Sequence, residues 1–285
     1  MANMASAIKL DSRGLGIRAK RCKAYGVSAL VLSPKEPAKD APGVLWIHGG
    51  GYMLGLKEMV YMSRALDLVQ RHGAVVVAPD YRLSVQAPYP AALNDCYLAL
   101  LWLVDNAEGL GVNPSQIMVG GESAGGGLAA ALCMMARDAG TVNVAFQMPL
   151  YPMTDNFDTE TSKDNHAKVW NTERNHLGWR LYLREKAHCD VSPYAAPARQ
   201  SDYADLPPAY TFVSTAEPFL AETVEYIENL KAAGVEADID TYEGLFHAFD
   251  MLRPDLEQSQ EAIRRFNERF DHARRRYFAD QPRWS

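Results

Sequence analysis

A short apolar run that enters a glycine-rich turn and leaves as a helix constrains the fold of this chain more than any other feature. The run Ile117–Val119 reads as a buried strand, and Leu128–Leu132 reads as part of a helix. Between them lies Gly121–Gly125, with the sequence GESAG and the pattern G-x-S-x-G. A sharp strand-to-helix turn of this kind projects its serine hydroxyl out of the fold, and its glycines leave room where a Cβ would clash with backbone. We therefore expect Ser123 at a helix N-terminus, where free N–H groups favour developing negative charge.

Short apolar runs alternate with helical patterns along most of the chain. Runs expected to form strands are 17–23, 27–32, 44–47, 74–78, 117–122, 144–150, 209–215 and 235–242. Expected helices are 57–71, 91–105, 124–137, 220–233 and 256–277. Such alternation indicates an α/β fold with a mainly parallel sheet and helices on both faces. The run 235–242 alternates apolar and acidic residues, which suits an edge strand or a strand that pairs with a partner subunit.

The alternation stops after Tyr151 and resumes after Pro207. The segment 152–207 is too long for a simple connection between a strand and a helix, so we expect an insertion with its own helices. Because it follows the strand after the serine turn, it is well placed to form a lid or a pocket wall. We predict one domain over 1–285 with 152–207 as a small helical cap; an extra helical layer on the core is the alternative.

The composition argues against several classes of protein. A net charge of −6 gives no electrostatic reason to expect nucleic acid or an anionic membrane as a partner. No stretch approaches the ~18 apolar residues of a membrane span, and the N-terminus lacks the basic region and apolar core of a signal peptide. The four cysteines lie far apart without C-x-x-C spacing, so we expect reduced thiols and no metal site. These observations predict a cytoplasmic protein.

A serine hydroxyl becomes a nucleophile at neutral pH when a base lies within hydrogen-bond reach and a third group orients that base. Of the seven histidines, His247 fits best, because it lies in a loop just after the last expected strand. That loop is at the same edge of the sheet as the turn that carries Ser123. The other histidines are expected in helical, solvated contexts, in the insertion or in the loop after 44–47.

The acid of such an arrangement should lie between the serine and the histidine in the chain. Glu217 is the first choice, because it follows the strand 209–215 and Pro218 would fix the turn after it. Glu222 is the competitor, although the helix dipole already explains an acid in the first turn of a helix. Further alternatives are Asp190 and Asp202.

The loop His48–Gly51, with the sequence HGGG, supplies an electrostatic partner. Consecutive glycines let bare backbone approach a reacting carbonyl group. We expect the N–H groups of Gly50, Gly51 and Ala124 to form an oxyanion hole. Loss of one such donor typically costs on the order of 100- to 1000-fold in rate. His48 is expected to support this loop through hydrogen bonds and not to transfer protons.

Together these motifs resemble the hormone-sensitive-lipase-like group of α/β-hydrolase esterases. The shared motifs are HGGG at 48–51, DYRL at 80–83, GESAG at 121–125 and SPYA at 192–195. The resemblance extends from about Val27 to the C-terminal helix. It implies the α/β-hydrolase fold and a serine carboxylesterase of the acetyl esterase type, which hydrolyses short-acyl esters without a cofactor through a triad of Ser123, His247 and Glu217 and an acyl-enzyme. In that family Asp80 and Arg82 belong to a motif that supports the oxyanion loop structurally.

The chain departs from the pattern of this family in two places. Glu217 precedes the proline of the acid motif, where the family usually has aspartate. Only 47 residues precede His48, so the N-terminal segment that usually supplies cap helices is shortened. We therefore expect a cap formed by 152–207 alone, with a more open pocket or a pocket that a second subunit completes in a homodimer.

Two other functions stay open at this point. The same triad could hydrolyse amides, formamides or carbamates, because a triad and an oxyanion hole serve all acyl transfers. A non-catalytic receptor of the same fold could bind a small molecule, although such receptors typically lose a member of the triad. An interfacial lipase is less favoured, because the sequence has no evident long apolar lid.

Overall fold

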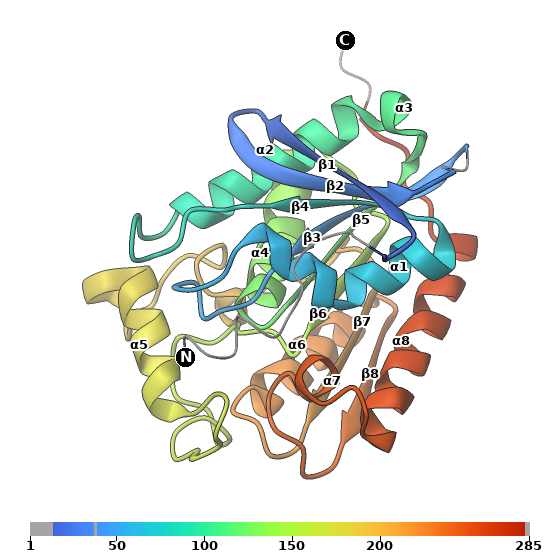
Figure 1. Cartoon of the computed structure of the whole chain (residues 1–285). Coiled ribbons are helices and arrows are strands. Elements are labelled where there is room, and N and C mark those ends of the chain that lie inside the picture. Colours follow the sequence, from blue (N-terminus) through green and yellow to red (C-terminus); the bar gives the residue numbers. More distant parts are fainter. Residues whose placement is uncertain (1–13, 37–38, 283–285) are drawn as a thin grey trace.

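A mixed, mostly parallel sheet forms the centre of the computed structural model, which describes residues 14–36 and 39–282 (Figure 1). Within these residues the sheet has eight strands in the order β1-β2-β4-β3-β5-β6-β7-β8. The strands are β1 (Ile17–Ala24), β2 (Val27–Pro34), β3 (Ala41–Ile47), β4 (Val75–Pro79), β5 (Val112–Glu122), β6 (Phe146–Leu150), β7 (Ala209–Ser214) and β8 (Ala237–Tyr242). The pairs β1–β2 and β2–β4 are antiparallel and the other neighbours are parallel. The mainly parallel sheet predicted from the sequence is confirmed.

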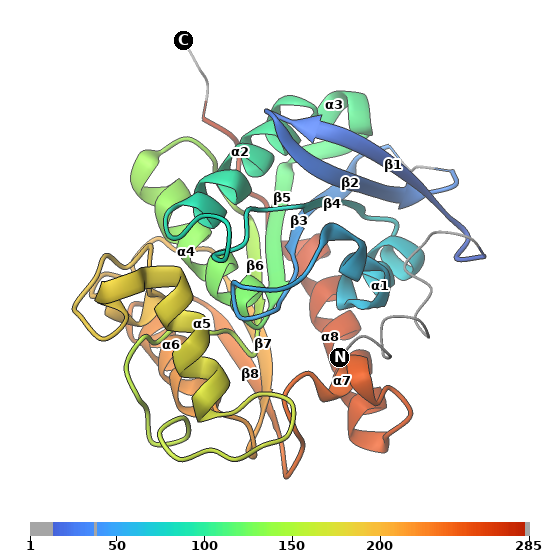
Figure 2. The same ribbon diagram turned by 60° about the vertical axis from the view of Figure 1, so that its left-hand side comes forward.

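Helices cover both faces of this sheet. The α-helices are α1 (Arg64–His72), α2 (Ala91–Asp105), α3 (Ala107–Leu110), α4 (Ala124–Ala139), α5 (Thr172–Leu183), α6 (Leu220–Ala232), α7 (Phe249–Leu252) and α8 (Glu257–Arg276). One apolar core joins the sheet to α2, α4 and α6, and a second core joins its other face to α1 and α8. Figure 2 shows α7 and α8 on the opposite side of the sheet from α4 and α6. Of the helices in these described ranges, none combines the length and apolar character of a membrane span.

The hydrophobic pattern explains which strands lie inside. All five residues of β4 are buried, as expected for a valine-rich strand covered on both faces. By contrast, β8 is an edge strand, where Asp238 and Asp240 form ion pairs with Arg269 and Arg265 of α8. The prediction of an edge strand at 235–242 is therefore confirmed.

Some predicted boundaries were wrong. The single helix expected over 57–71 is two elements, because a 3-10 helix, η1 (Lys57–Met62), precedes α1. Ser63 separates them, and its side chain accepts a hydrogen bond from the N–H group of Ala65 at 3.1 Å. Strand β3 begins at Ala41 and not at Val44, since the N–H group of Ala41 donates to the carbonyl of Gly111 at 3.0 Å.

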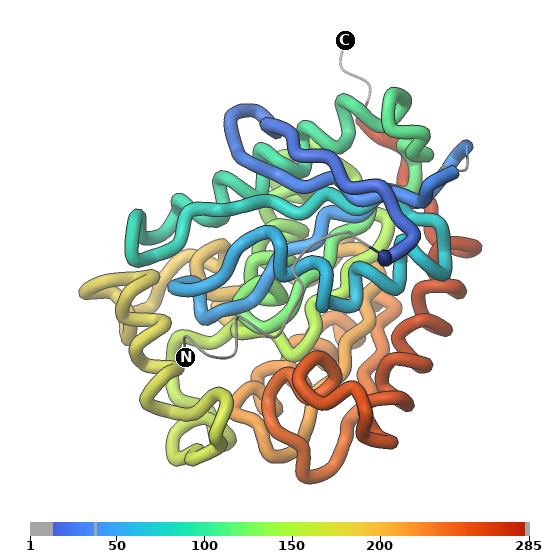
Figure 3. Tube along the Cα trace, in the orientation of Figure 1, coloured from blue at the N-terminus to red at the C-terminus, as the bar shows by residue number. Residues whose placement is uncertain are grey.

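The segment 152–207 contains α5 and two 3-10 helices, η2 (Arg184–Lys186) and η3 (Pro197–Arg199). The trace in Figure 3 shows α5, in yellow, beside the loops that follow β3 and β4. Two hydrogen bonds join this segment to the loop after β4: the N–H group of Tyr89 donates to the Tyr182 carbonyl at 2.9 Å, and Arg184 donates to the Ser84 carbonyl at 2.9 Å. The segment thus lies against the loops at the carboxyl ends of the parallel strands.

Candidate active site

The turn between β5 and α4 has the geometry expected of a nucleophile elbow. Ser123 has φ 59° and ψ −121°, a conformation that L-residues rarely adopt. A Cβ at Gly121 would lie 2.5 Å from the carbonyl oxygen of Ile47, and one at Gly125 would lie 2.1 Å from the same atom. Both positions therefore require glycine for steric reasons, because a side chain at either one would push the turn away from β3.

Hydrogen bonds hold the strained residue in place. The N–H group of Ser123 donates to the carbonyl of Leu150 at 3.0 Å. Its own carbonyl accepts from the N–H groups of Gly127 and Met153, both at 3.0 Å. A conformation of this kind costs on the order of 1–3 kcal/mol and persists only where the surroundings fix it. The elbow is thus fixed by the end of β6 and by the first turn of α4.

The structure brings Ser123, His247 and Glu217 together from the loops after β5, β8 and β7. The imidazole Nε2 of His247 lies 2.9 Å from the hydroxyl oxygen of Ser123. Its Nδ1 hydrogen-bonds to Oε2 of Glu217, whose Oε1 accepts from the N–H group of Ser214 at 2.9 Å. The exposed fractions of Ser123, His247 and Glu217 are 6%, 4% and 0%. The imidazole can therefore accept a proton at Nε2 while the carboxylate orients Nδ1.

The other candidate acids lie elsewhere. Glu222, in α6, accepts hydrogen bonds from the N–H groups of Thr154 at 2.6 Å and Asp155 at 3.2 Å. Its carboxyl group is buried, and this burial raises its pKa well above the usual value. Asp190 and Asp202 are exposed. Of the acids considered from the sequence, only Glu217 contacts His247.

The glycine loop after β3 presents free N–H groups close to the elbow. Gly50 and Gly51 have φ of 123° and 60°, and a Cβ at Gly49 would lie 3.1 Å from the Cβ of Ser123. Ala124 is the first residue of α4, so its N–H group has no partner inside the helix. Among the hydrogen bonds formed within 14–36 and 39–282, none uses the N–H groups of Gly50, Gly51 or Ala124. Within these ranges the three N–H groups therefore have no acceptor.

His48 lies at the base of this loop. Its Nδ1 is 2.8 Å from the carbonyl oxygen of Gly49, and its ring stacks on Tyr81 with centroids 4.2 Å apart. The hydroxyl of Tyr81 in turn donates to the His48 carbonyl at 3.0 Å. Burial lowers the pKa of His48 to about 4, so the ring is neutral at neutral pH. These contacts fix the His48 ring against the loop and Tyr81.

The DYRL motif contacts its neighbours and not the serine. A carboxylate oxygen of Asp80 accepts from Nζ of Lys57 at 2.8 Å, just beyond the glycine loop. Arg82 forms a bidentate ion pair with Asp95 of α2, with N–O distances of 2.8 and 2.9 Å. Both contacts tie the loop after β4 to adjacent elements.

Three aromatic side chains around His247 were not predicted as site residues. The rings of Tyr151, Phe219 and Trp170 lie with their centroids 5.1, 5.1 and 6.3 Å from that of the imidazole. Trp170 also covers Gly51, where an added Cβ would lie 2.1 Å from the indole ring. The sequence offered only the aromatic content of the insertion as a signal for Trp170. These three rings form walls around the imidazole, whereas the expectation of a more open pocket, or of one that a second subunit completes, stays a prediction.

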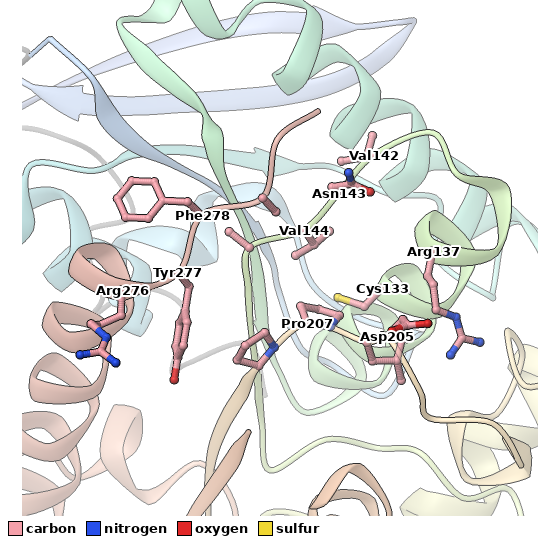
Figure 4. A pocket seen from close by; sticks show the side chains of 14 residues that line it. Cys133, Arg137, Val142, Asn143, Val144, Asp205, Pro207, Arg276, Tyr277 and Phe278 are labelled. Carbon is pink, nitrogen blue, oxygen red and sulfur yellow. The ribbon is translucent and has the colours of Figure 1, made fainter. Parts of the chain in front are cut away.

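Two cavities in the described part of the chain are lined by residues other than the predicted site residues. One cavity of about 410 Å³ lies at the amino ends of β6 and β7, lined in part by Cys133, Arg137 and Tyr277 (Figure 4). This is the opposite end of the sheet from Ser123. A cavity of about 880 Å³ lies beside the C-terminal end of α5, between Tyr89 and Val191. Within the described ranges, no three His, Cys, Asp or Glu side chains are grouped as metal ligands.

Comparisons with known proteins identify the family of this chain. The family model for the alpha/beta hydrolase fold matches residues 44–251. Esterase LipI of Mycobacterium tuberculosis is 33% identical over 213 residues, which cover 74% of this chain and 66% of LipI. Carboxylesterase NlhH of the same species is 32% identical over 221 residues, which cover 76% of this chain and 69% of NlhH. This chain therefore spans about two thirds of the length of these two relatives.

A solved structure extends the match to most of the chain. Esterase LipW of Mycobacterium marinum superposes with a TM-score of 0.87 at 29% identity, covering 95% of this chain and 87% of LipW. The family model, the two relatives and the superposed structure all indicate the same family. The chain belongs to the α/β-hydrolase fold family, and the three similar proteins reported above are named as two esterases and a carboxylesterase.

Proposed function

We propose that this chain is a serine carboxylesterase that hydrolyses short-acyl esters through an acyl-enzyme intermediate. The observation that carries the proposal is the 2.9 Å contact between Nε2 of His247 and the hydroxyl of Ser123, with Glu217 on Nδ1. His247 takes the serine proton as the oxygen attacks the ester carbonyl, and returns it to the leaving alcohol. Glu217 orients the ring and stabilises the imidazolium. Water activated by the same histidine then releases the acid.

The negative charge of the tetrahedral intermediate needs donors that are already in position. The free N–H groups of Gly50, Gly51 and Ala124 supply them, and His48 supports the loop that carries two of the three. All of these steps use side chains and backbone groups of the chain itself. The HGGG and GESAG motifs also support membership in the hormone-sensitive-lipase-like group.

We further propose that 152–207 acts as a cap on one catalytic domain. Its Trp170 ring covers Gly51 and faces His247, which leaves little space beside the reacting carbonyl. This limited space favours short acyl groups.

We also propose that two chains form a homodimer through the edge strand β8, and that the protein is cytoplasmic. Sedimentation at several protein concentrations tests the dimer, and a chain that stays monomeric at all of them excludes it.

Single substitutions at the triad test the mechanism. Ser123→Ala, His247→Ala and Glu217→Gln should each lower kcat on p-nitrophenyl acetate, by on the order of 10⁴-fold. Glu222→Gln is the matched control, a second buried glutamate that does not contact His247. Its kcat should stay within about tenfold of the wild type. Wild-type turnover in Ser123→Ala, or a large loss in Glu222→Gln alone, contradicts the assignment.

A substrate panel separates esterase activity from the alternatives. The complete triad favours an enzyme over a receptor, and it would also serve amides, formamides and carbamates. We expect p-nitrophenyl acetate to be hydrolysed far faster than the matched anilide and carbamate. In a series from acetate to palmitate, we expect the highest kcat/KM at the short end. A maximum at long chains excludes the short-acyl preference.

A further inference from the structure

A second buried carboxylate lies behind the catalytic histidine. The ring of Tyr151 meets the imidazole of His247 edge to face, with centroids 5.1 Å apart at 79°. The hydroxyl of the same tyrosine donates to Oδ1 of Asp250 at 3.0 Å. Asp250 is fully buried and lies three residues after His247, in α7. The imidazole therefore has Glu217 on one side and a chain of Tyr151 and Asp250 on another.

One guanidinium group faces this carboxylate. Nε of Arg64 lies 3.0 Å from Oδ2 of Asp250, and the arginine is 7% exposed. The terminal NH1 of Arg64 also pairs with Asp67 at 2.7 Å. Asp67 is near the surface and has a second partner in Arg71 at 3.2 Å. The negative charge of Asp67 is thus also compensated by Arg71 at the surface, whereas the charge of Asp250 is compensated by Arg64.

Glu122, the residue before the serine, belongs to the same buried group. It accepts hydrogen bonds from the indole N–H of Trp46 at 2.8 Å and from the backbone N–H of Arg64 at 3.3 Å. Burial, and then the nearby charge of Asp250, raise the pKa of Glu122 to about 8. At neutral pH and below, Glu122 is therefore largely uncharged.

Among the described residues, the carboxylates of Glu217 and Asp250 lie around the imidazole, and the guanidinium of Arg64 pairs with Asp250. When His247 takes the proton of Ser123, the positive charge forms on the imidazole, and the matching negative charge passes to the oxygen of the tetrahedral intermediate at the glycine loop. Charges interact more strongly in a buried site than in water, so the second carboxylate favours the protonated imidazole.

We propose that Asp250 is a positioning residue for His247: held by Arg64 and Tyr151, it adds negative charge that stabilises the imidazolium formed when Ser123 gives up its proton. The proposal rests on the function proposed above, since it presumes that His247 is the base. It assigns to the site a second carboxylate that does not touch the substrate. Burial raises the pKa of Asp250, whereas Arg64 and the Tyr151 hydroxyl oppose that rise.

Asp250→Asn removes this charge and keeps the shape of the side chain. Without the charge the imidazolium is less stable, so the acid limb of kcat/KM should move to lower pH, by about 0.5 to 1 unit. The rate at pH 7 should fall about three- to tenfold, because a less basic imidazole is a weaker general base. Asp255→Asn is the matched control, an exposed carboxylate five residues further on. Asp255→Asn should change neither the acid limb of the kcat/KM profile nor the rate at pH 7. The pH profile of p-nitrophenyl acetate hydrolysis measures both.

A purely structural role for Asp250 predicts a different result. Asp250→Asn would then lower the rate or the stability with the acid limb unmoved, and that outcome overturns the proposal. If this variant does not fold, Tyr151→Phe decides, because it keeps the ring and removes the hydroxyl that donates to Asp250. The acid limb of the kcat/KM profile of this variant should also move to lower pH, by a smaller amount. An unmoved acid limb overturns the proposal. Fluorophosphonate labelling of wild-type Ser123 tests the underlying function separately: absence of labelling counts against the function, and labelling with an unmoved limb counts against Asp250 alone.

Discussion

Gly51→Ala perturbs the glycine loop after β3, and the clash that it creates can be worked out atom by atom. Gly51 has φ 60°, and an ideal Cβ would lie 2.1 Å from Cη2 and 2.8 Å from Cζ2 of Trp170. Normal contacts begin near 3.4 Å, so either the indole or the loop must move by more than 1 Å. Trp170 is only 7% exposed, and its N–H points to Asn175 at 3.5 Å. The loop, with its free N–H group, is therefore expected to move.

Two costs combine in this variant. Alanine in the left-handed region costs on the order of 1–2 kcal/mol, and overpacking a closed site typically costs 1–3 kcal/mol more. If the Gly51 N–H group leaves its position, kcat should fall on the order of 100- to 1000-fold. Gly140→Ala is the matched control, because Gly140 also has φ 60° and no atom lies within 4 Å of its ideal Cβ. The variant Gly140→Ala should lose only the stability that the left-handed backbone conformation costs, and it should keep the wild-type kcat.

The assay is steady-state hydrolysis of p-nitrophenyl acetate, with urea unfolding of each variant. We expect a large loss of kcat in Gly51→Ala and partial recovery in the double variant Gly51→Ala/Trp170→Leu, which makes room for the methyl group. A Gly51→Ala enzyme within threefold of the wild-type kcat would show that the added methyl group does not displace the Gly51 N–H group. An equal loss in Gly140→Ala would contradict the role of the clash, because the effect would then come from backbone strain in general.

Three further predictions concern buried titratable groups. The pKa of Glu122 is raised from its usual value of 4.5 to about 8 in the folded chain. Between these two values the unfolded chain loses the proton and the folded chain keeps it, so the free energy of unfolding of the wild type should fall as pH rises, by up to about 1.4 kcal/mol per pH unit. Urea unfolding of Glu122→Gln should show a flatter profile there, and an equally steep one rules out this origin. The pKa of His48 is lowered from 6.5 to about 4, so the contribution of this residue to stability is lost as pH falls through that interval. The variant His48→Gln should therefore lose less stability than the wild type as pH falls through the same interval. An unchanged acid transition would contradict the explanation by burial. Glu222→Ala leaves the N–H groups of Thr154 and Asp155 without their acceptor and should lower the free energy of unfolding by about 1–3 kcal/mol per group, whereas unchanged stability would show that water replaces the carboxylate.

The position of the catalytic candidates was predictable because it follows from topology. The carboxyl ends of parallel strands meet at one edge of a sheet, so residues just after β5, β7 and β8 had to lie near one another. Ser123, Glu217 and His247 occupy those three positions. The choice between Glu217 and Glu222 was harder, because both follow β7 and only the turn decides which carboxylate reaches the imidazole.

The surroundings of the site could not be predicted from local patterns. Arg64 begins a helix with an amphipathic pattern, where an arginine usually faces solvent, and nothing nearby in sequence indicates its partner Asp250. Their contact depends on how α1 and α7 pack against the same end of the sheet. Trp170 is a similar case, since its contact with Gly51 joins two loops 119 residues apart. Local pattern determines elements, whereas these contacts arise only when the elements pack together.

Strand and helix boundaries failed for the same reason. The apolar run of β3 starts at Val44, but pairing with the segment around Gly111 extends the strand back to Ala41. The helical pattern over 57–71 is continuous in sequence, yet Ser63 caps a new helix there. Both boundaries depend on hydrogen bonds that a hydrophobic pattern does not contain.

Mass spectrometry of the intact chain after reaction with an alkyl fluorophosphonate tests whether Ser123 is the nucleophile. We expect one adduct per chain, located by peptide mapping on Ser123, and loss of the p-nitrophenyl acetate activity in step with labelling. Ser123→Ala should show neither the adduct nor the activity. An adduct on another residue, or full labelling that leaves hydrolysis intact, would contradict the assignment of Ser123 as the nucleophile.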